Sequence, residues 1–130
     1  MAEALHIHKG ACHCGAVSFE FQAPRELPMT LCNCSICALT GYEHIFIKHA
    51  DLKFISGKNN MTEYRFGSGQ ACHMFCKTCG IKPLYQPRSH PDSYSVNYRC
   101  LTSKSLTISE TIPFEGRDWE KNIAGLRDKT

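Results

Sequence analysis

Short runs in which apolar and polar residues alternate are spread along most of the chain. In segment 16–22, for example, polar residues separate Val17, Phe19 and Phe21. A period of two is typical of a strand that buries one face. Clusters of Gly, Pro, Asn and Ser separate the runs and indicate turns. The pattern predicts a mainly β fold, with strands near residues 16–22, 43–48, 52–56, 61–67, 71–75, 82–86, 93–98 and 105–112.

The same pattern predicts the surroundings of some side chains. Tyr94, Val96 and Tyr98 share one face of segment 93–98, and this face is expected in the core. An edge strand is expected around Ile7, with the flanking His6 and His8 exposed. After Asp118, apolar residues recur at helical spacing, which predicts a short C-terminal helix capped by that residue. Its apolar positions are Trp119, Ile123 and Leu126.

Length and composition indicate one soluble globular domain over residues 1–130, because the chain is 42% apolar and 21% charged. With 15 Lys and Arg against 12 Asp and Glu, the net charge is +3. Since no long basic run is present, nucleic acid is not an expected partner. No apolar run approaches the roughly 20 residues of a membrane span, and residues 1–15 lack the features of a secretory signal. A cytoplasmic protein is expected, and the sequence leaves its oligomeric state open.

Nine cysteines are an unusual number for a chain of this length. An odd count in tight clusters, without an export signal, favours metal binding over disulfides. Two cysteines, Cys72 and Cys100, lie apart from the clusters and are expected to be buried free thiols. The clusters are a C-x-C at Cys12 and Cys14, a C-x-C-x-x-C at Cys32, Cys34 and Cys37, and a C-x-x-C at Cys76 and Cys79.

The first and last clusters are interpreted as two halves of one closed zinc site. Sulfurs around a tetrahedral zinc lie roughly 3.8 Å apart, whereas side chains two positions apart on a flat strand are about 6.8 Å apart. Each pair must therefore lie on a tight turn. Gly15 and Gly80 directly follow the two pairs and supply the positive φ that such turns need. A structural zinc on Cys12, Cys14, Cys76 and Cys79 is predicted.

The middle cluster supplies three thiolates within six residues and no nearby fourth cysteine. Three protein ligands and one open position are typical of catalytic zinc, so Cys32, Cys34 and Cys37 are the predicted catalytic ligands. Two alternatives remain: no metal, or a closed site in which another side chain is the fourth ligand. The candidates for that ligand are His44, His49, Cys72 and His73, with His44 also a candidate proton donor.

Three cysteine motifs in this order resemble the glutathione-dependent formaldehyde-activating family, which includes centromere-protein-V-like proteins. The strings that carry the resemblance are GACHCGAV from Gly10, CNCSIC from Cys32 with Gly41 after it, FCKTCG from Phe75, VNYRCL from Val96 and FEGRDW from Phe114. The similarity covers roughly residues 10–120. It implies a β-tent fold with a short C-terminal helix, a structural zinc on the four cysteines and a second zinc on the middle three.

The resemblance also implies a reaction. In this family, the thiol of glutathione adds to formaldehyde and gives S-hydroxymethylglutathione, which is the chemistry of a carbon–sulfur lyase. A thiol and a small aldehyde are therefore the expected substrates. One departure concerns Ala38-Leu39-Thr40, which stand where many members carry basic residues after the third middle cysteine. The absence of that charge weakens the attraction for an anionic thiol such as glutathione.

Two other kinds of function are consistent with the sequence. A zinc-stapled module could bind a protein or nucleic acid without catalysis, and a third class would sense metal or buffer thiols. An exchangeable metal at the middle cluster favours an enzyme. Two permanently closed sites, with salt-dependent nucleic-acid binding, favour the module.

Overall fold

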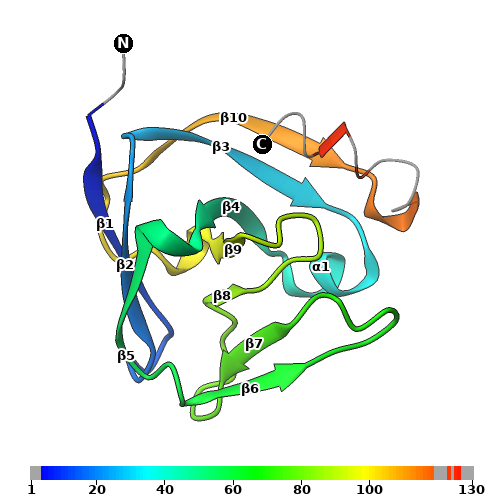
Figure 1. Cartoon of the computed structure of the whole chain (residues 1–130), viewed down its shortest axis with the longest axis horizontal. Helices are drawn as coiled ribbons and strands as arrows, with labels where there is room; N and C mark the ends of the chain where they lie inside the picture. The colour runs from blue at the N-terminus through cyan, green and yellow to red at the C-terminus, as the bar shows by residue number, and fades with distance from the viewer. Residues whose placement is uncertain (1–3, 119–122, 124, 127–130) are drawn as a thin grey trace.

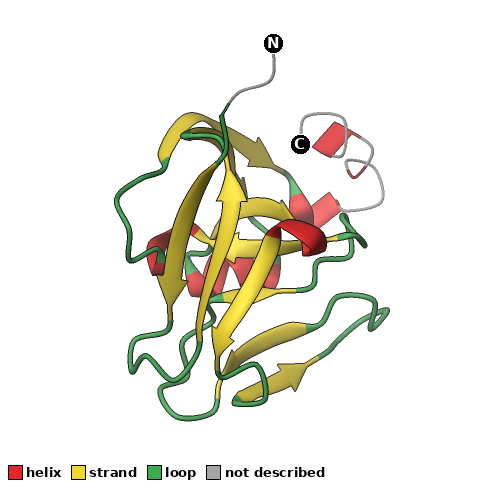
Figure 2. Ribbon diagram, turned by 60° about the vertical axis from the view of Figure 1, so that its left-hand side comes forward, coloured by secondary structure: helices red, strands yellow, loops and turns green. Residues whose placement is uncertain are grey.

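The computed structural model describes residues 4–118, 123, 125 and 126. This part of the chain is mainly β, as predicted, and its elements are shown in Figures 1 and 2. The strands are β1 (His6–Ala11), β2 (Ser18–Ala23), β3 (Glu26–Cys32), β4 (Glu43–Lys48), β5 (Leu52–Ser56), β6 (Met61–Tyr64), β7 (His73–Cys76), β8 (Leu84–Tyr85), β9 (Ser93–Asn97) and β10 (Thr107–Phe114). The helical elements are α1 (Ser35–Thr40) and three 3₁₀ turns, η1 (His49–Asp51), η2 (Tyr98–Cys100) and η3 (Gly116–Asp118).

The strands form three sheets. β1, β2 and β5 make an antiparallel sheet along one side of the molecule in Figure 1. The largest sheet has the order β10-β3-β4-β9-β8, and its β10–β3 pair is parallel. β6 and β7 form a separate hairpin at the bottom of Figure 1. Distant parts of the chain therefore meet, because the last strand pairs with the third.

The core lies between the three-stranded and five-stranded sheets. The predicted alternation in β2 is confirmed, since Phe19 and Phe21 are each 1% exposed and Val17, just before the strand, is fully buried. From the other sheet, apolar side chains of β4, β8 and β9 pack against them. The buried members of this cluster are Phe19, Phe21, Ala23, Ile45, Ile47, Leu84, Val96 and Leu106.

β3 is the strand that the alternation pattern did not predict. Its segment contains Pro28, which lacks a backbone N–H and argues against a strand inside a sheet. In the structure, the parallel register with β10 shifts between Ile108 and Thr111, opposite Leu27 and Met29. Pro28 therefore lies at a β-bulge, where a missing donor is tolerated. β10 itself contains a proline too, but it is an edge strand.

The predicted core face of β9 is confirmed, since Val96 belongs to the buried cluster and Tyr94 and Tyr98 pack against it. The opposite face is buried as well, with Ser93 at 5% and Ser95 at 0% exposure. The polar atoms of Ser95 are satisfied, since its hydroxyl is 2.8 Å from His44 Nδ1 and its carbonyl accepts from the Tyr42 hydroxyl at 2.6 Å.

The expected exposure of His8 was wrong, because this side chain is fully buried although β1 is an edge strand. Its ring nitrogens are 2.6 Å from Ser105 Oγ and 3.1 Å from the Pro24 carbonyl, so its polar atoms are satisfied.

Most of the predicted C-terminal helix, including Trp119, lies outside the described residues. Ile123, Gly125 and Leu126 are helical, and Leu126 is buried. Within the described ranges, no helix has both the length and the apolar character needed to cross a bilayer.

The core predicts a clear difference between two isoleucines. Ile45 is 1% exposed in β4, whereas Ile55 is 55% exposed in β5. Ile45→Ala should lower the free energy of unfolding by about 2–5 kcal/mol, because it removes buried methylene groups and leaves a cavity. The matched control Ile55→Ala should cost less than about 1 kcal/mol. Urea unfolding of both variants measures the difference, and equal losses would contradict this description of the core.

Candidate metal centres

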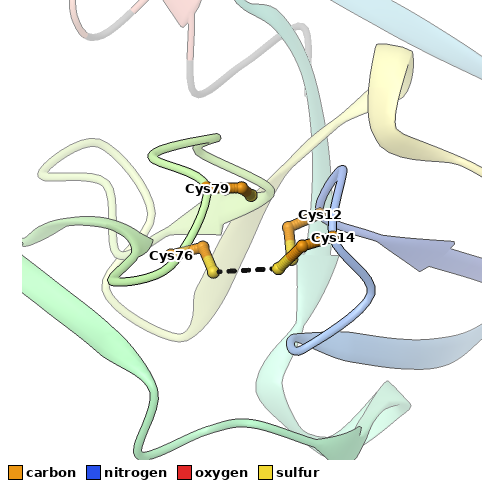
Figure 3. Close-up of side chains that lie close together, drawn as sticks. All are labelled: Cys12, Cys14, Cys76 and Cys79. Atoms are coloured by element: carbon orange, nitrogen blue, oxygen red, sulfur yellow. Dashed lines mark hydrogen bonds between the residues drawn. The ribbon is translucent and has the colours of Figure 1, made fainter.

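The first and last cysteine pairs meet at one point. Cys12 and Cys14 lie at the turn between β1 and β2, while Cys76 ends β7 and Cys79 lies in the turn after it. Figure 3 shows the two turns facing each other with their side chains pointing inward. All four sulfurs lie within 4.8 Å of one another. Sulfur–sulfur distances of 3.7 Å join Cys14 both to Cys12 and to Cys76. These separations match the roughly 3.8 Å edge of a tetrahedral zinc–thiolate site.

The two turns have the same backbone geometry. In each, the N–H of the first cysteine donates to the carbonyl five residues later, from Cys12 to Val17 and from Cys76 to Ile81. The predicted positive φ values are confirmed at 81° for Gly15 and 77° for Gly80. This region of φ is costly for residues with a Cβ atom. The glycines therefore let both short spacings direct two sulfurs to one point.

Backbone N–H groups also favour the thiolate form that a metal requires. Val17 N–H donates to the Cys12 sulfur at 3.3 Å and Thr78 N–H to the Cys76 sulfur at 3.4 Å. A backbone hydrogen bond from Cys79 lowers the pKa of Cys76 to about 6. Another, from Ile81, lowers the pKa of Cys79. Donors aimed at sulfur stabilise its negative charge, so the Cys76 and Cys79 sulfurs are well suited to bind a dication.

The middle cluster forms a second group. Cys32 ends β3, Cys34 directly precedes α1, and Cys37 lies one turn into that helix. Their three sulfurs lie within 4.8 Å of one another. Among the described residues, no ring nitrogen, further sulfur or carboxylate oxygen joins this group within the same limit. The four candidates for a closing ligand, His44, His49, Cys72 and His73, are thus not members of it.

Without a cation, the three sulfurs cannot all ionise. Hydrogen bonds from Cys32 and Cys37 lower the pKa of Cys34 to about 2. The bond to Cys34 raises the pKa of Cys32 to about 11, and bonds to the other two sulfurs raise that of Cys37. One negative charge is therefore shared by the three. A divalent metal ion would compensate two further negative charges, so the other two thiols would lose their protons when the metal binds.

His44 contacts this group from β4. Its Nε2 is 3.3 Å from the Cys37 sulfur, and its Nδ1 is 2.8 Å from Ser95 Oγ and 3.2 Å from the Tyr85 hydroxyl. Burial lowers the pKa of His44 to about 3, so the ring is neutral near pH 7. With two hydroxyls at Nδ1, the arrangement favours a proton on Nε2 that is donated to sulfur. The predicted proton donor thus holds a ligand sulfur in place.

One side of the three-cysteine group opens on a cleft of about 230 Å³. Cys34 and Gly116 lie at the sulfur side of this cleft. Its other walls come from the segment after β6 and from Arg88. These lining residues are Phe66, Gly67, Ser68, Ala71 and Arg88. A small molecule in the cleft would lie against Cys34.

The segment after β10 packs directly against the group, and the cysteine spacing gave no sign of this. A Cβ atom on Gly116 would lie 2.4 Å from the Cys32 sulfur and 2.9 Å from the Cys34 Cβ. Asn33 binds this segment through its amide, which donates to Glu115 at 2.8 Å and accepts from the Arg117 N–H at 3.2 Å. The only sequence signal for the contact was the string from Phe114 that resembles the family.

The remaining candidates lie elsewhere. Cys72 is buried, as expected for a free thiol, and Cys100 is half-buried. Arg99 forms an exposed ion pair with Glu43 at 3.2 Å. His13 is exposed in the first turn. None of these side chains belongs to either sulfur group within the described residues.

The fold and the sites define a small β protein with two cysteine groups that can hold metal ions. A profile of the glutathione-dependent formaldehyde-activating enzyme family matches residues 7–114. The chain belongs to this family. A Halomonas elongata protein with the provisional name glutathione-dependent formaldehyde-activating enzyme is 36% identical, and the match covers 94% of this chain and 90% of that protein. The crystal structure of a Rhodobacter sphaeroides protein matches with a TM-score of 0.67 and 35% identity, over 78% of this chain and 99% of that one.

The close approach of Gly116 generates a prediction. Gly116→Ala should displace the Cys32 and Cys34 sulfurs, because no space exists for a methyl group. The metal content of the purified protein should fall from about two ions to about one per chain, as only the three-sulfur group is disturbed. Elemental analysis measures this content, and circular dichroism verifies that the fold is retained.

The matched control is Gly125→Ala, because nothing lies within 4 Å of a Cβ at that position. It should leave the metal content unchanged. Full metal content in Gly116→Ala would show that the contact between η3 and the cysteines does not shape the group.

Proposed function

We propose that the protein is a zinc-dependent carbon–sulfur lyase that joins a thiol to formaldehyde or a small aldehyde, and catalyses the reverse cleavage. The observation that carries this proposal is a group of three sulfurs that opens on a cleft and has no fourth ligand among the described residues. Family membership supports the same chemistry. A group limited to structural zinc would be closed by four protein ligands.

The two metal sites have different roles in this proposal. Cys12, Cys14, Cys76 and Cys79 hold a structural zinc, and Cys32, Cys34 and Cys37 hold a catalytic one. When bound to the three sulfurs, zinc supplies an open position at which a substrate thiol becomes a thiolate. Thiolate ligands make zinc a weaker Lewis acid than histidines do, so holding a thiol fits this site better than activating water.

The reaction moves one proton and forms one bond. The thiol sulfur attacks the aldehyde carbon, a C–S bond forms, and the carbonyl π pair moves to oxygen. The proton that leaves sulfur ends on this oxygen, so no oxidant or reductant is needed. The chain's part is to hold the thiol against Cys34 in the cleft and to bring the small aldehyde next to it.

The cleft provides some of the recognition. Phe66 and Ala71 give it apolar walls, and Arg88 is its one charged lining residue within the described ranges. A guanidinium is the side chain best suited to bind a carboxylate. Arg88 thus offers a positive charge that Ala38-Leu39-Thr40 do not, and a carboxylate-bearing thiol such as glutathione is the proposed substrate class.

The same chemistry supports a location in the cytoplasm. Both proposed sites need their cysteines as thiolates, and seven such groups persist best in a reducing compartment.

The central test is the substitution Cys34→Ser. It should reduce the zinc content from about two ions to about one, because two sulfurs bind zinc far more weakly than three. The fold should persist, since the four-cysteine group is untouched. The rate of S-hydroxymethyl thiol formation from a thiol and formaldehyde should fall by at least about 10²-fold, as for the loss of a catalytic metal. Elemental analysis and a nuclear magnetic resonance assay of the adduct measure both effects.

Cys100→Ser is the matched control, because Cys100 is a half-buried free thiol outside both groups. It should retain two zinc ions and full activity. The proposed enzymatic function would be refuted if S-hydroxymethyl thiol formed at the same rate with wild type, with Cys34→Ser and without protein. With two zinc ions retained and salt-dependent nucleic-acid binding, that result would favour the binding module instead.

The structural role of the other group is tested by Cys76→Ser. Binding of a structural zinc supplies on the order of 10–16 kcal/mol, which is comparable with the whole stability of a domain, about 5–15 kcal/mol. The variant should therefore be unfolded at 25 °C by circular dichroism, or aggregated. A Cys76→Ser protein that stays folded but loses its activity would show that the structural and catalytic roles of the two groups must be reversed.

A further inference from the structure

A buried lysine that plays no part in the chemistry described so far is linked to the three-cysteine group through side-chain contacts. Its ammonium lies over the ring of Tyr85, whose hydroxyl is 3.2 Å from His44 Nδ1. His44 Nε2 is in turn 3.3 Å from the Cys37 sulfur. Lys82 is 9% exposed. Its ammonium lies 3.8 Å from the ring centre of Tyr85 and 4.8 Å from that of Tyr42. It also donates to Nδ1 of His73 at 2.6 Å. Two ring faces and one nitrogen therefore fix the position of this charge.

In the part of the chain that the structure describes, Lys82 has no carboxylate partner. Its neighbours are neutral rings. Burial lowers the pKa of Lys82 to about 8. The opposing influence, which favours the charged form, comes from the sulfurs of Cys37, Cys34 and Cys32. Buried charges need a compensating partner, and the cysteine group is the one present.

His73 connects this lysine to the cleft. Its ring stacks on Tyr85 with centroids 4.7 Å apart, and on Phe66 with centroids 5.4 Å apart. Phe66 lines the cleft beside Cys34. Burial lowers the pKa of His73 to about 4, so this ring is neutral. Its Nδ1 can therefore accept a hydrogen bond from the Lys82 ammonium. The charge is thus held at a fixed depth behind the cleft wall.

Formal charges indicate what such a lysine would do. Three thiolates and a zinc ion sum to −1, and an anionic fourth ligand makes the sum −2. A nearby positive charge lowers the cost of that second negative charge, but has little effect on a neutral ligand. We propose that Lys82 is the internal counter-charge of the three-cysteine group, and that it makes the site prefer an anionic fourth ligand such as a thiolate over a neutral one. This inference rests on the proposed function.

The experiment compares two ligands on the zinc-loaded protein. 2-Mercaptoethanol binds as an anion and imidazole binds as a neutral ligand, and calorimetry measures both affinities. Lys82→Met removes the charge and keeps the length of the side chain. It should weaken thiol binding by about tenfold or more, equivalent to a rise of at least one unit in the pKa of the bound thiol. Imidazole binding should change by less than about twofold.

Two further variants separate charge from packing. Lys82→Arg keeps the positive charge and should restore most of the thiol affinity. Lys53→Met, a change of the same type at an exposed position in β5, should bind both ligands as wild type does. The proposal is overturned if Lys82→Met keeps its thiol affinity, or if Lys82→Arg loses as much as Lys82→Met.

Zinc content distinguishes failure of this inference from failure of the proposed function. A wild-type protein that binds one zinc ion refutes the catalytic site itself. If Lys82→Met alone loses the second zinc, recovery in Lys82→Arg supports the counter-charge and continued loss overturns it. If neither variant folds, the test uses the wild-type protein with 2-mercaptoethanol bound. Thiocyanate, an anion, should displace this thiol at a lower concentration than the neutral imidazole does. The reverse order overturns the proposal.

Discussion

The convergence of four cysteine sulfurs is the constraint on which the rest of the structure depends. Cys14 and Cys76 are 62 residues apart in the sequence and their sulfurs are 3.7 Å apart. Around them, the buried apolar cluster is small, with Val17 and Met61 as its main side chains besides the cysteines. So little apolar surface contributes only a few kcal/mol to stability. The sulfur group, with the packing of Phe54 and Met74 beside it, therefore joins the β6–β7 hairpin to the β1–β2–β5 sheet.

This junction determines the surroundings of the second group. β7 begins at His73, and the turn between β6 and β7 carries Phe66. Both side chains lie between Lys82 and the cleft. The three-cysteine group is local in sequence, but its neighbours come from β4, β8, β9 and η3. A site with a short motif thus acquires its surroundings from segments that are distant in the sequence.

The sequence predicted the parts of the molecule that local rules control. Strands at 43–48 and 52–56 have exactly the predicted bounds, and the cysteine spacing identified both sulfur groups. β3 was missed because Pro28 obscures the alternation, and its bulge is defined by pairing with a strand some 80 residues later. The buried polar groups were missed for the same reason. Ser95 and Lys82 carry no local signal of burial, because only tertiary contacts place their partners beside them.

The parallel pairing of β10 with β3 has a consequence for the order of assembly during synthesis. All four sulfurs of the first group have been translated once residue 79 is complete, whereas the backbone that packs on Cys32 and Cys34 arrives only with Gly116. Contacts between distant segments form late. With the roles proposed for the two groups, a nascent chain can therefore bind its structural metal while the other group still lacks this contact, so the proposed scaffold site is complete before the proposed catalytic site.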